Sequence, residues 1–142
     1  MSLTVLVPTG NAADVIEDCL RGVTFADELL VVDSFSSDGT IEIARRYATR
    51  VIQREYGYSA SQKNWAIPQA AGDWVLIVDT DERVTPELQN EVLQAIQSSD
   101  YDGYLIPRLN HCFGRPMRNG GNWPDHQLRL FRRDLGRYED VM

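Results

Sequence analysis

The sequence is poor in the residues that build disulfide scaffolds, histidine metal sites and membrane spans. Its two cysteines, Cys19 and Cys112, lie far apart without a Cys-x-x-Cys pair, so we expect reduced thiols in a cytoplasmic protein. Its two histidines, His111 and His126, lack the helical spacing of a paired-histidine metal site. No apolar run is long enough to cross a bilayer, and the first residues carry no secretory pattern.

Charge is unevenly distributed along the 142 residues. The net charge of −7 argues against general nucleic-acid binding. Residues 1–107 hold 7 Lys and Arg against 17 Asp and Glu, whereas residues 108–142 hold 7 Arg against 4 acids. A positive C-terminal part beside an acidic body is typical of an anion-binding segment, and equally of a solvated arginine face. Both interpretations stay open at this point.

Hydrophobic periodicity predicts strands that alternate with helices over the first 105 residues. Apolar, β-prone runs predict strands at Leu3–Pro8, Glu28–Asp33, Arg50–Glu55 and Asp73–Asp79. Apolar residues at helical spacing predict helices over residues 15–23, 41–48, 59–72 and 86–96. Strands are also expected within 102–109 and 127–133, on either side of a long loop rich in Gly, Pro and aromatic residues. The alternation predicts an α/β fold with a parallel sheet and helices on both faces.

Several local signals mark the ends of these helices. Asn11 is a candidate N-cap for the first helix, and Thr85 with Pro86 has the typical pattern of a capped helix start. Pro68 is expected to kink the third helix, and Gly72 to end it.

Polar residues end three of the predicted strands. The first strand ends in Pro8-Thr9-Gly10-Asn11, the second in Asp33-Ser34 and the fourth in Asp79-Thr80-Asp81. Ligands of parallel α/β sheets bind at the carboxyl ends of the strands, so these residues predict one crevice for a small ligand. The Gly10-Asn11 turn is placed to offer N–H groups to a phosphate, but no GxGxxG or P-loop pattern is present, so a plain turn remains an alternative.

The two aspartates of the fourth strand end are the strongest candidates for chemistry. Asp79 and Asp81 are two residues apart, which would place both carboxylates on one face of a strand. Two neighbouring carboxylates repel each other, so they favour a cation between them, and oxygen ligands suit Mg²⁺ or Mn²⁺. The alternative is a polar turn. Glu82 is interpreted as an ordinary turn residue that pairs with Arg83 or with solvent.

Three further residues have both a functional and a structural interpretation. Lys63, the one lysine of the chain, is placed to meet a phosphate as a point charge, or else is an exposed helix lysine. Trp123 has a flat face that suits a sugar ring, or else pins its own loop. His126 is a candidate substrate contact, although a loop histidine without chemistry is the simpler interpretation.

Four stretches in this order resemble the family-2 glycosyltransferases of the GT-A fold: LTVLVPTGN, ELLVVDSFSSDGTIEIA, SQKNWAIPQAAGDWVLIVDTDERV and DHQLRLFRR. The resemblance covers nearly the whole chain. Within the family, it is strongest to the subgroup of bacterial enzymes that are similar to lipopolysaccharide-core glucosyltransferases. It implies one domain over 1–142 with a mostly parallel central sheet. Residues 1–107 would bind the nucleotide-sugar, and 108–142 would form part of the acceptor side.

The resemblance also implies an activity. It implies an inverting transfer of a sugar from a nucleotide-sugar donor, UDP-linked, to a glycan or lipid-linked acceptor in cell-envelope polysaccharide synthesis. It implies a divalent cation, Mg²⁺ or Mn²⁺, and a location in the cytoplasm or at the inner face of the membrane. The oligomeric state is not predicted.

By the same match, Asp79-Thr80-Asp81 corresponds to the family's Asp-x-Asp motif. Asp79 would face the ribose or the metal, and Asp81 would bind the metal and the diphosphate. The resemblance places these further residues in the donor pocket: Pro8, Thr9, Asn11, Asp33, Ser34, Lys63 and Thr80. Many relatives have a second acid at the position of Ser34. This chain departs from that pattern, and the departure affects the predicted contact with the nucleobase of the donor.

An inverting transfer needs a carboxylate that takes the proton from the acceptor hydroxyl. Related enzymes often place it in a Glu-Asp pair after the metal motif, which here is Glu139-Asp140. Asp140 is therefore the candidate base, with Asp125 as its rival. We expect the chain to end inside the acceptor-side part, so a module that binds a nucleotide-sugar without turnover is one alternative. A sugar-1-phosphate nucleotidyltransferase is another, for which PTGNAAD is a poor triphosphate loop.

Overall fold

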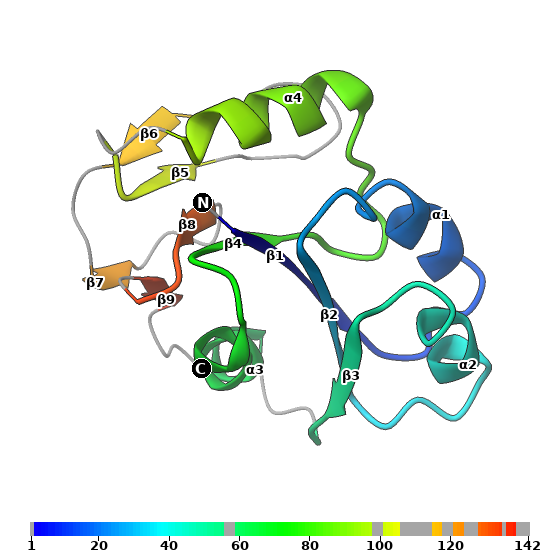
Figure 1. Ribbon diagram of the computed structural model, residues 1–142. Helices are drawn as coiled ribbons and strands as arrows, with labels where there is room; N and C mark the ends of the chain where they lie inside the picture. The colour runs from blue at the N-terminus through cyan, green and yellow to red at the C-terminus, as the bar shows by residue number, and fades with distance from the viewer. Residues whose placement is uncertain are drawn as a thin grey trace.

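A seven-stranded sheet forms the centre of the computed structural model, which describes residues 2–55, 59–97, 101–105, 115–117, 121–123, 128–134 and 136–138 (Figure 1). The sheet has the strand order β3-β2-β1-β4-β8-β5-β6, and two short strands, β7 and β9, pair separately. The strands are β1 (Leu3–Thr9), β2 (Glu28–Asp33), β3 (Arg50–Gln53), β4 (Trp74–Ile77), β5 (Gly103–Leu105), β6 (Arg115–Met117), β7 (Gly121–Trp123), β8 (Leu128–Arg132) and β9 (Gly136–Tyr138). The helices are α1 (Ile16–Arg21), α2 (Thr40–Ala44), α3 (Ser59–Ala66), the 3₁₀ turn η1 (Ile67–Gln69) and α4 (Pro86–Ala95).

Strand direction in the sheet is mostly parallel, as the sequence predicts. The first four strands run parallel, with Val5 of β1 opposite Leu29 of β2 and Leu76 of β4. The later strands add antiparallel pairs, β4 with β8, β8 with β5, and β5 with β6. The antiparallel β8 brings residues from the end of the chain beside β4, a neighbour that periodicity does not predict.

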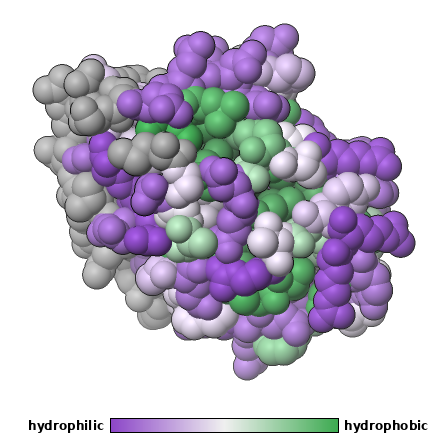
Figure 2. Space-filling view, viewed as in Figure 1, coloured by the Kyte–Doolittle hydropathy of each residue, from purple (hydrophilic) through white to green (hydrophobic). Residues whose placement is uncertain are grey.

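Helices cover both faces of the sheet, because the strands are apolar on both sides. Val5 and Val7 of β1 pack with α1, α2 and α4, whereas Leu6 packs with α3 and η1 on the opposite face. The helix α4 contributes the predicted stripe, in which Leu88 and Val92 are buried. Figure 1 shows α1 and α2 on one side of β2 and β3, and α3 on the other side. In the same view, hydrophobic surface lies mainly in recesses between hydrophilic side chains (Figure 2).

The predicted helix ends are partly confirmed. Thr85 caps α4, since its Oγ1 accepts a hydrogen bond from the Leu88 N–H at 3.1 Å and Pro86 opens the helix. The α3 helix tightens into the 3₁₀ turn η1 around Pro68, which cannot donate a backbone hydrogen bond. The prediction that Asn11 caps α1 is wrong, because α1 begins several residues later, at Ile16, without a side-chain cap.

A buried carboxylate joins the strands at the end of the sheet opposite the predicted crevice. Glu28, the first residue of β2, accepts hydrogen bonds from the Thr4 hydroxyl and the Ala71 N–H, both at 2.8 Å, and from the Arg50 Nε at 2.9 Å. Next to this carboxylate, Gly72 packs against β1 so closely that an added Cβ would lie 2.6 Å from the Thr4 nitrogen. Glycine is therefore required at this turn. Within the part of the chain that is described, none of the helices combines the length and apolar character needed to span a bilayer.

Candidate active site

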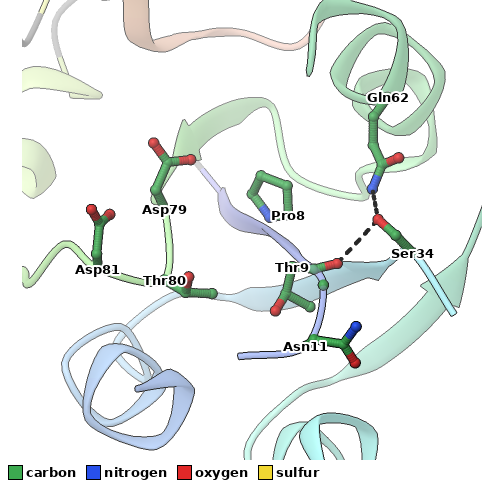
Figure 3. A pocket seen from close by; sticks show the side chains of 9 residues that line it. Pro8, Thr9, Asn11, Ser34, Gln62, Asp79, Thr80 and Asp81 are labelled. Atoms are coloured by element: carbon green, nitrogen blue, oxygen red, sulfur yellow. Dashed lines mark hydrogen bonds between the residues drawn. The ribbon is translucent and has the colours of Figure 1, made fainter. Parts of the chain in front are cut away.

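One cleft of about 660 Å³ lies at the carboxyl ends of β1, β2 and β4 (Figure 3). It is lined by Pro8, Thr9, Gly10, Asn11, Ser34, Gln62, Asp79, Thr80 and Asp81. The expectation that three polar strand ends meet in one crevice is thus confirmed. Gln62, on α3, is a lining residue that the sequence reasoning missed; its position next to Lys63 was the available signal.

Two loops with left-handed backbone conformations form the β1–β2 side of the cleft. Asn11 has φ 48° and Phe35 has φ 56°, values that non-glycine residues rarely adopt. Hydrogen bonds hold these loops together: the Asn11 N–H donates to the Ser36 Oγ, and the Ser37 N–H donates to the Asn11 Oδ1, both at 2.8 Å. Asn11 therefore bridges two loops instead of capping a helix.

Ser34 connects the β2 end to the α3 side of the cleft. Its hydroxyl donates to the Thr9 carbonyl at 3.2 Å and accepts from the Gln62 Nε2 at 3.1 Å, as the dashed lines in Figure 3 show. The neutral hydroxyl of Ser34 thus joins the two sides of the cleft.

Asp33 lies directly behind this cleft lining and is fully buried. Its carboxylate accepts hydrogen bonds from the Ser36 N–H at 2.8 Å, from the Ser36 hydroxyl at 2.5 Å and from the Gln53 Nε2 at 3.3 Å. Because Ser36 also holds Asn11, the Asp33 carboxylate supports the loop that forms the cleft. A contact between Asp33 and a ligand stays a prediction.

Asp79 and Asp81 lie in a turn and not in a strand, so the argument from strand faces was wrong. β4 ends at Ile77, and the Glu82 N–H donates to the Asp79 carbonyl at 2.9 Å. Both aspartates nevertheless line the cleft, and their carboxylates project to the same side of the turn (Figure 3). The Asp79 side chain is 41% exposed and Asp81 is exposed, so a ligand can reach both.

Glu82 is a structural part of this site, and its interpretation as an ordinary turn residue is wrong. It is buried, its Oε1 accepts from the Asp79 N–H at 2.9 Å, and it forms an ion pair with the Arg129 Nη1 at 2.6 Å. Arg129 comes from β8, so the pairing depends on the β4–β8 contact. The acidic stretch that follows the buried strand β4 was a signal in the sequence, but the sequence did not show that Arg129 is the partner of Glu82.

Other contacts hold the opposite side of the Asp79 turn. Arg83 donates to the carbonyls of Thr80 at 2.7 Å, Glu82 at 2.8 Å and Val15 at 3.3 Å. The Cys19 thiol on α1 donates to the Asp79 carbonyl at 3.5 Å, and burial raises the pKa of this thiol to about 12. The turn is therefore fixed on both sides, while the side chains of Asp79, Thr80 and Asp81 line the cleft.

Lys63 is buried on α3, so its interpretation as an exposed helix lysine is wrong. Burial lowers the pKa of its ammonium group, and the negative charge of Asp79 partly opposes this effect while Arg129 adds to it. The lysine thus interacts electrostatically with the Asp79 turn, although it does not line the cleft. A contact with a phosphate stays a prediction.

The remaining candidates lie outside the described residues. These are Asp125, Asp140, His111, His126 and the side chain of Trp123. Among the described residues, no group of three or more His, Cys, Asp or Glu side chains is placed to hold a metal ion. The two aspartates offer oxygen ligands only, which fits a hard cation that takes its other ligands from water and a substrate phosphate.

The architecture and the site define a class of protein. The parallel α/β sheet extended by the antiparallel strand β8 beside β4 is the GT-A fold, which the chain shares with solved glycosyltransferases. The family model "Glycosyl transferase family 2" matches residues 4–139. The chain therefore belongs to glycosyltransferase family 2, as the resemblance implied.

One curated relative is named for lipopolysaccharide core biosynthesis. The chain is 26% identical over 145 residues to the lipopolysaccharide core biosynthesis glycosyltransferase LpsC of Rhizobium meliloti, a match that covers 98% of this chain and 54% of LpsC. Other curated relatives match over 37% to 38% of their own length. The chain thus spans well under two thirds of the length of these relatives.

Solved structures of similar fold contain nucleotide-sugars. Staphylococcus aureus TarS 1–349 in complex with UDP-GlcNAc has a TM-score of 0.65 and 30% identity, over 75% of this chain and 34% of that chain. The mannosyltransferase PcManGT of Pyrobaculum calidifontis, in complex with GDP-Man and Mn²⁺, has a TM-score of 0.69 and 23% identity, over 93% of this chain and 44% of that chain. At 23% identity the second likeness shows the fold alone.

Proposed function

We propose that the cleft binds the nucleoside diphosphate of a UDP-linked sugar donor, and that the sugar is transferred with inversion to a glycan or lipid-linked acceptor. The observation that carries the proposal is the pair Asp79 and Asp81 on a fixed turn beside the cleft. Family membership and the TarS complex with UDP-GlcNAc support it. The reaction would take place in the cytoplasm, at the inner face of the membrane, during cell-envelope polysaccharide synthesis, the context of LpsC.

The donor set of the turn fits Mg²⁺ or Mn²⁺. Asp79 and Asp81 would hold the cation, which supplies Lewis-acid stabilisation of the charge on the leaving diphosphate when it is bound. Thr9, Asn11 and Ser34 would position the nucleoside, since they line the other side of the same cleft. Pro8 and Thr80 complete the pocket, and Lys63 would add positive charge behind the diphosphate.

Transfer to an acceptor needs residues beyond the described cleft. A carboxylate must accept the proton of the attacking hydroxyl, and Asp140 is our candidate, with Asp125 as its rival. The arginines within 108–142 would attract an anionic acceptor such as a phosphorylated lipid-linked sugar. These assignments rest on the match to the family.

A thermal unfolding experiment with the full chain tests donor binding. UDP with Mn²⁺ at 100 times the dissociation constant adds about 2.7 kcal/mol of stability. For a domain of this size that raises Tm by roughly 5 to 10 °C. Asp81→Ala should abolish the shift, whereas Asp18→Ala, which removes an exposed carboxylate on α1, should keep it.

No shift with any nucleoside diphosphate plus metal would overturn the proposal. A shift without donor hydrolysis or sugar transfer would instead favour a module that binds without turnover. Release of pyrophosphate from a nucleoside triphosphate and a sugar 1-phosphate would identify a nucleotidyltransferase.

A further inference from the structure

We propose that Glu82 is a positioning residue that keeps the Arg129 guanidinium away from the carboxylate of Asp79, so that Asp79 stays available to a cation. This inference rests on the proposed function of the Asp79 turn as a cation site. Glu82 would not touch the cation itself. It would act by determining which acid Arg129 pairs with.

The geometry shows one guanidinium nitrogen between two carboxylates. The Arg129 Nη1 lies 2.6 Å from the Glu82 Oε1 but 3.5 Å from the Asp79 Oδ2. The shorter contact is a charge-assisted hydrogen bond, whereas the longer one exceeds the usual length of such a bond. Arg129 is thus bonded to Glu82 and only close to Asp79.

Burial explains why the Arg129 guanidinium pairs with Glu82 and not with Asp79. The Glu82 side chain is 7% exposed and the Asp79 side chain 41%, so water screens the attraction of Arg129 to Asp79 more strongly than its attraction to Glu82. A buried carboxylate also costs free energy unless it is paired. Glu82 therefore holds the guanidinium, and the Asp79 carboxylate keeps its exposed oxygens.

The same Glu82 oxygen also fixes the backbone of Asp79. The Glu82 Oε1 accepts the Asp79 N–H at 2.9 Å in addition to the Arg129 Nη1. One atom therefore positions both the main chain of the candidate ligand and the positive charge that competes for it. If Glu82 lost its charge, Asp79 would be the remaining anionic partner of Arg129 among the described residues, at a distance that a small side-chain movement closes.

The consequence is a specific pattern of cation affinity. Glu82→Gln should weaken Mn²⁺ binding in the presence of UDP, because the released Arg129 pairs with Asp79 and occupies its oxygens. Substitutions of residues that orient metal ligands typically weaken metal binding 10- to 100-fold, so we expect a loss of about 10-fold or more. The double variant Glu82→Gln with Arg129→Met should recover most of the affinity, because the competing cation is gone.

Glu28→Gln is the matched control. It neutralises another buried glutamate in an ion pair, with Arg50 at the far end of the sheet. It should lower the urea midpoint without changing the Mn²⁺ affinity. A purely structural role of Glu82 would make Glu82→Gln behave in the same way.

The experiment titrates Mn²⁺ into the full chain with saturating UDP, follows free Mn²⁺ by electron paramagnetic resonance, and measures urea unfolding of each variant. Weaker binding in Glu82→Gln with recovery in the double variant supports the inference. Unchanged binding in Glu82→Gln, or no recovery in the double variant, overturns it.

Three further outcomes have a defined consequence. If Glu82→Gln does not fold, Glu82→Asp replaces it, because it keeps the charge while withdrawing the carboxylate from Arg129; it too should bind Mn²⁺ more weakly, and unchanged binding overturns the inference. If the unsubstituted chain binds no Mn²⁺ with UDP, the proposed function fails and this inference fails with it. Tight Mn²⁺ binding that is insensitive to Glu82 refutes the inference alone.

Discussion

Replacing Asp33 by Asn tests whether this carboxylate supports the cleft or contacts the donor base. Both views predict a loss of donor binding, but they differ in their effect on stability. Asp33 is fully buried and accepts three hydrogen bonds, two from Ser36 and one from Gln53. Ser36 in turn accepts the Asn11 N–H at the cleft. The substitution therefore acts on a buried connection between β2 and the cleft loop.

The expected magnitude follows from what asparagine can accept. An amide has one acceptor oxygen where the carboxylate has two, so at least one of the three donors loses its partner. A hydrogen bond to a charged group contributes about 1.5–3 kcal/mol, so we expect a loss of about 2 kcal/mol in the free energy of unfolding. For a chain of 142 residues this lowers Tm by roughly 6 °C.

Urea unfolding followed by circular dichroism measures the stability, and UDP titration with Mn²⁺ measures donor binding. Asp73→Asn is the control, because its exposed carboxylate accepts the Ser2 N–H at 3.2 Å and hydroxyl at 3.0 Å at the other end of the sheet. This control should lose less stability and keep UDP binding. Unchanged stability of Asp33→Asn together with lost UDP binding would refute the supporting role and favour a direct contact.

Three further predictions concern the fold that holds the site. Burial alone would raise the pKa of Glu28, but the hydrogen bonds from Ala71, Thr4 and Arg50 lower it below its ordinary value of 4.5. A lowered folded-state pKa stabilises the fold at pH values above the unfolded-state pKa, and this stabilisation is lost as the pH falls through the folded-state pKa. The urea midpoint should therefore decrease as the pH is lowered below about 4.5, and Glu28→Gln should make the midpoint less dependent on pH. Gly72→Ala should cost about 2 kcal/mol or more, because its Cβ would meet backbone atoms; a neutral result in thermal unfolding would contradict the close approach. Thr85→Ala should cost about 1 kcal/mol and Thr85→Ser much less, since serine keeps the capping oxygen; equal losses in the two variants would argue against the cap.

The periodic part of the chain was predictable because its signals are local. The second strand was predicted over the same residues that form β2, and Thr85 and Pro86 marked the start of α4 correctly. The three polar strand ends met where the rule for parallel sheets places them. The strand and the helix start depend on short stretches of sequence, whereas the meeting of the strand ends follows from the parallel pairing of β1 with β2 and β4.

The failures also have physical reasons. Asparagine is a residue type that is favoured at N-caps, but the Asn11 side chain accepts a hydrogen bond from Ser37 of another loop. Residue spacing along one helix does not reveal such a partner. For Lys63, the sequence left two interpretations open, an exposed helix lysine and a phosphate contact. Helix periodicity alone does not determine which face of the helix packs against the sheet. The two aspartates were assigned to a strand, although β4 ends before them, at Ile77.

The sequence by itself determined the fold class and placed the three acids close after the fourth strand, because hydrophobic period and strand ends are written along the chain. The order of its motifs carried the resemblance to family-2 glycosyltransferases. Only the tertiary structure decided the role of Glu82. Arg129 is 47 residues away in the chain and reaches Glu82 because β8 runs antiparallel beside β4. Burial then separates the three acids of the turn: it keeps Glu82 paired with Arg129 and leaves Asp79 and Asp81 facing the cleft.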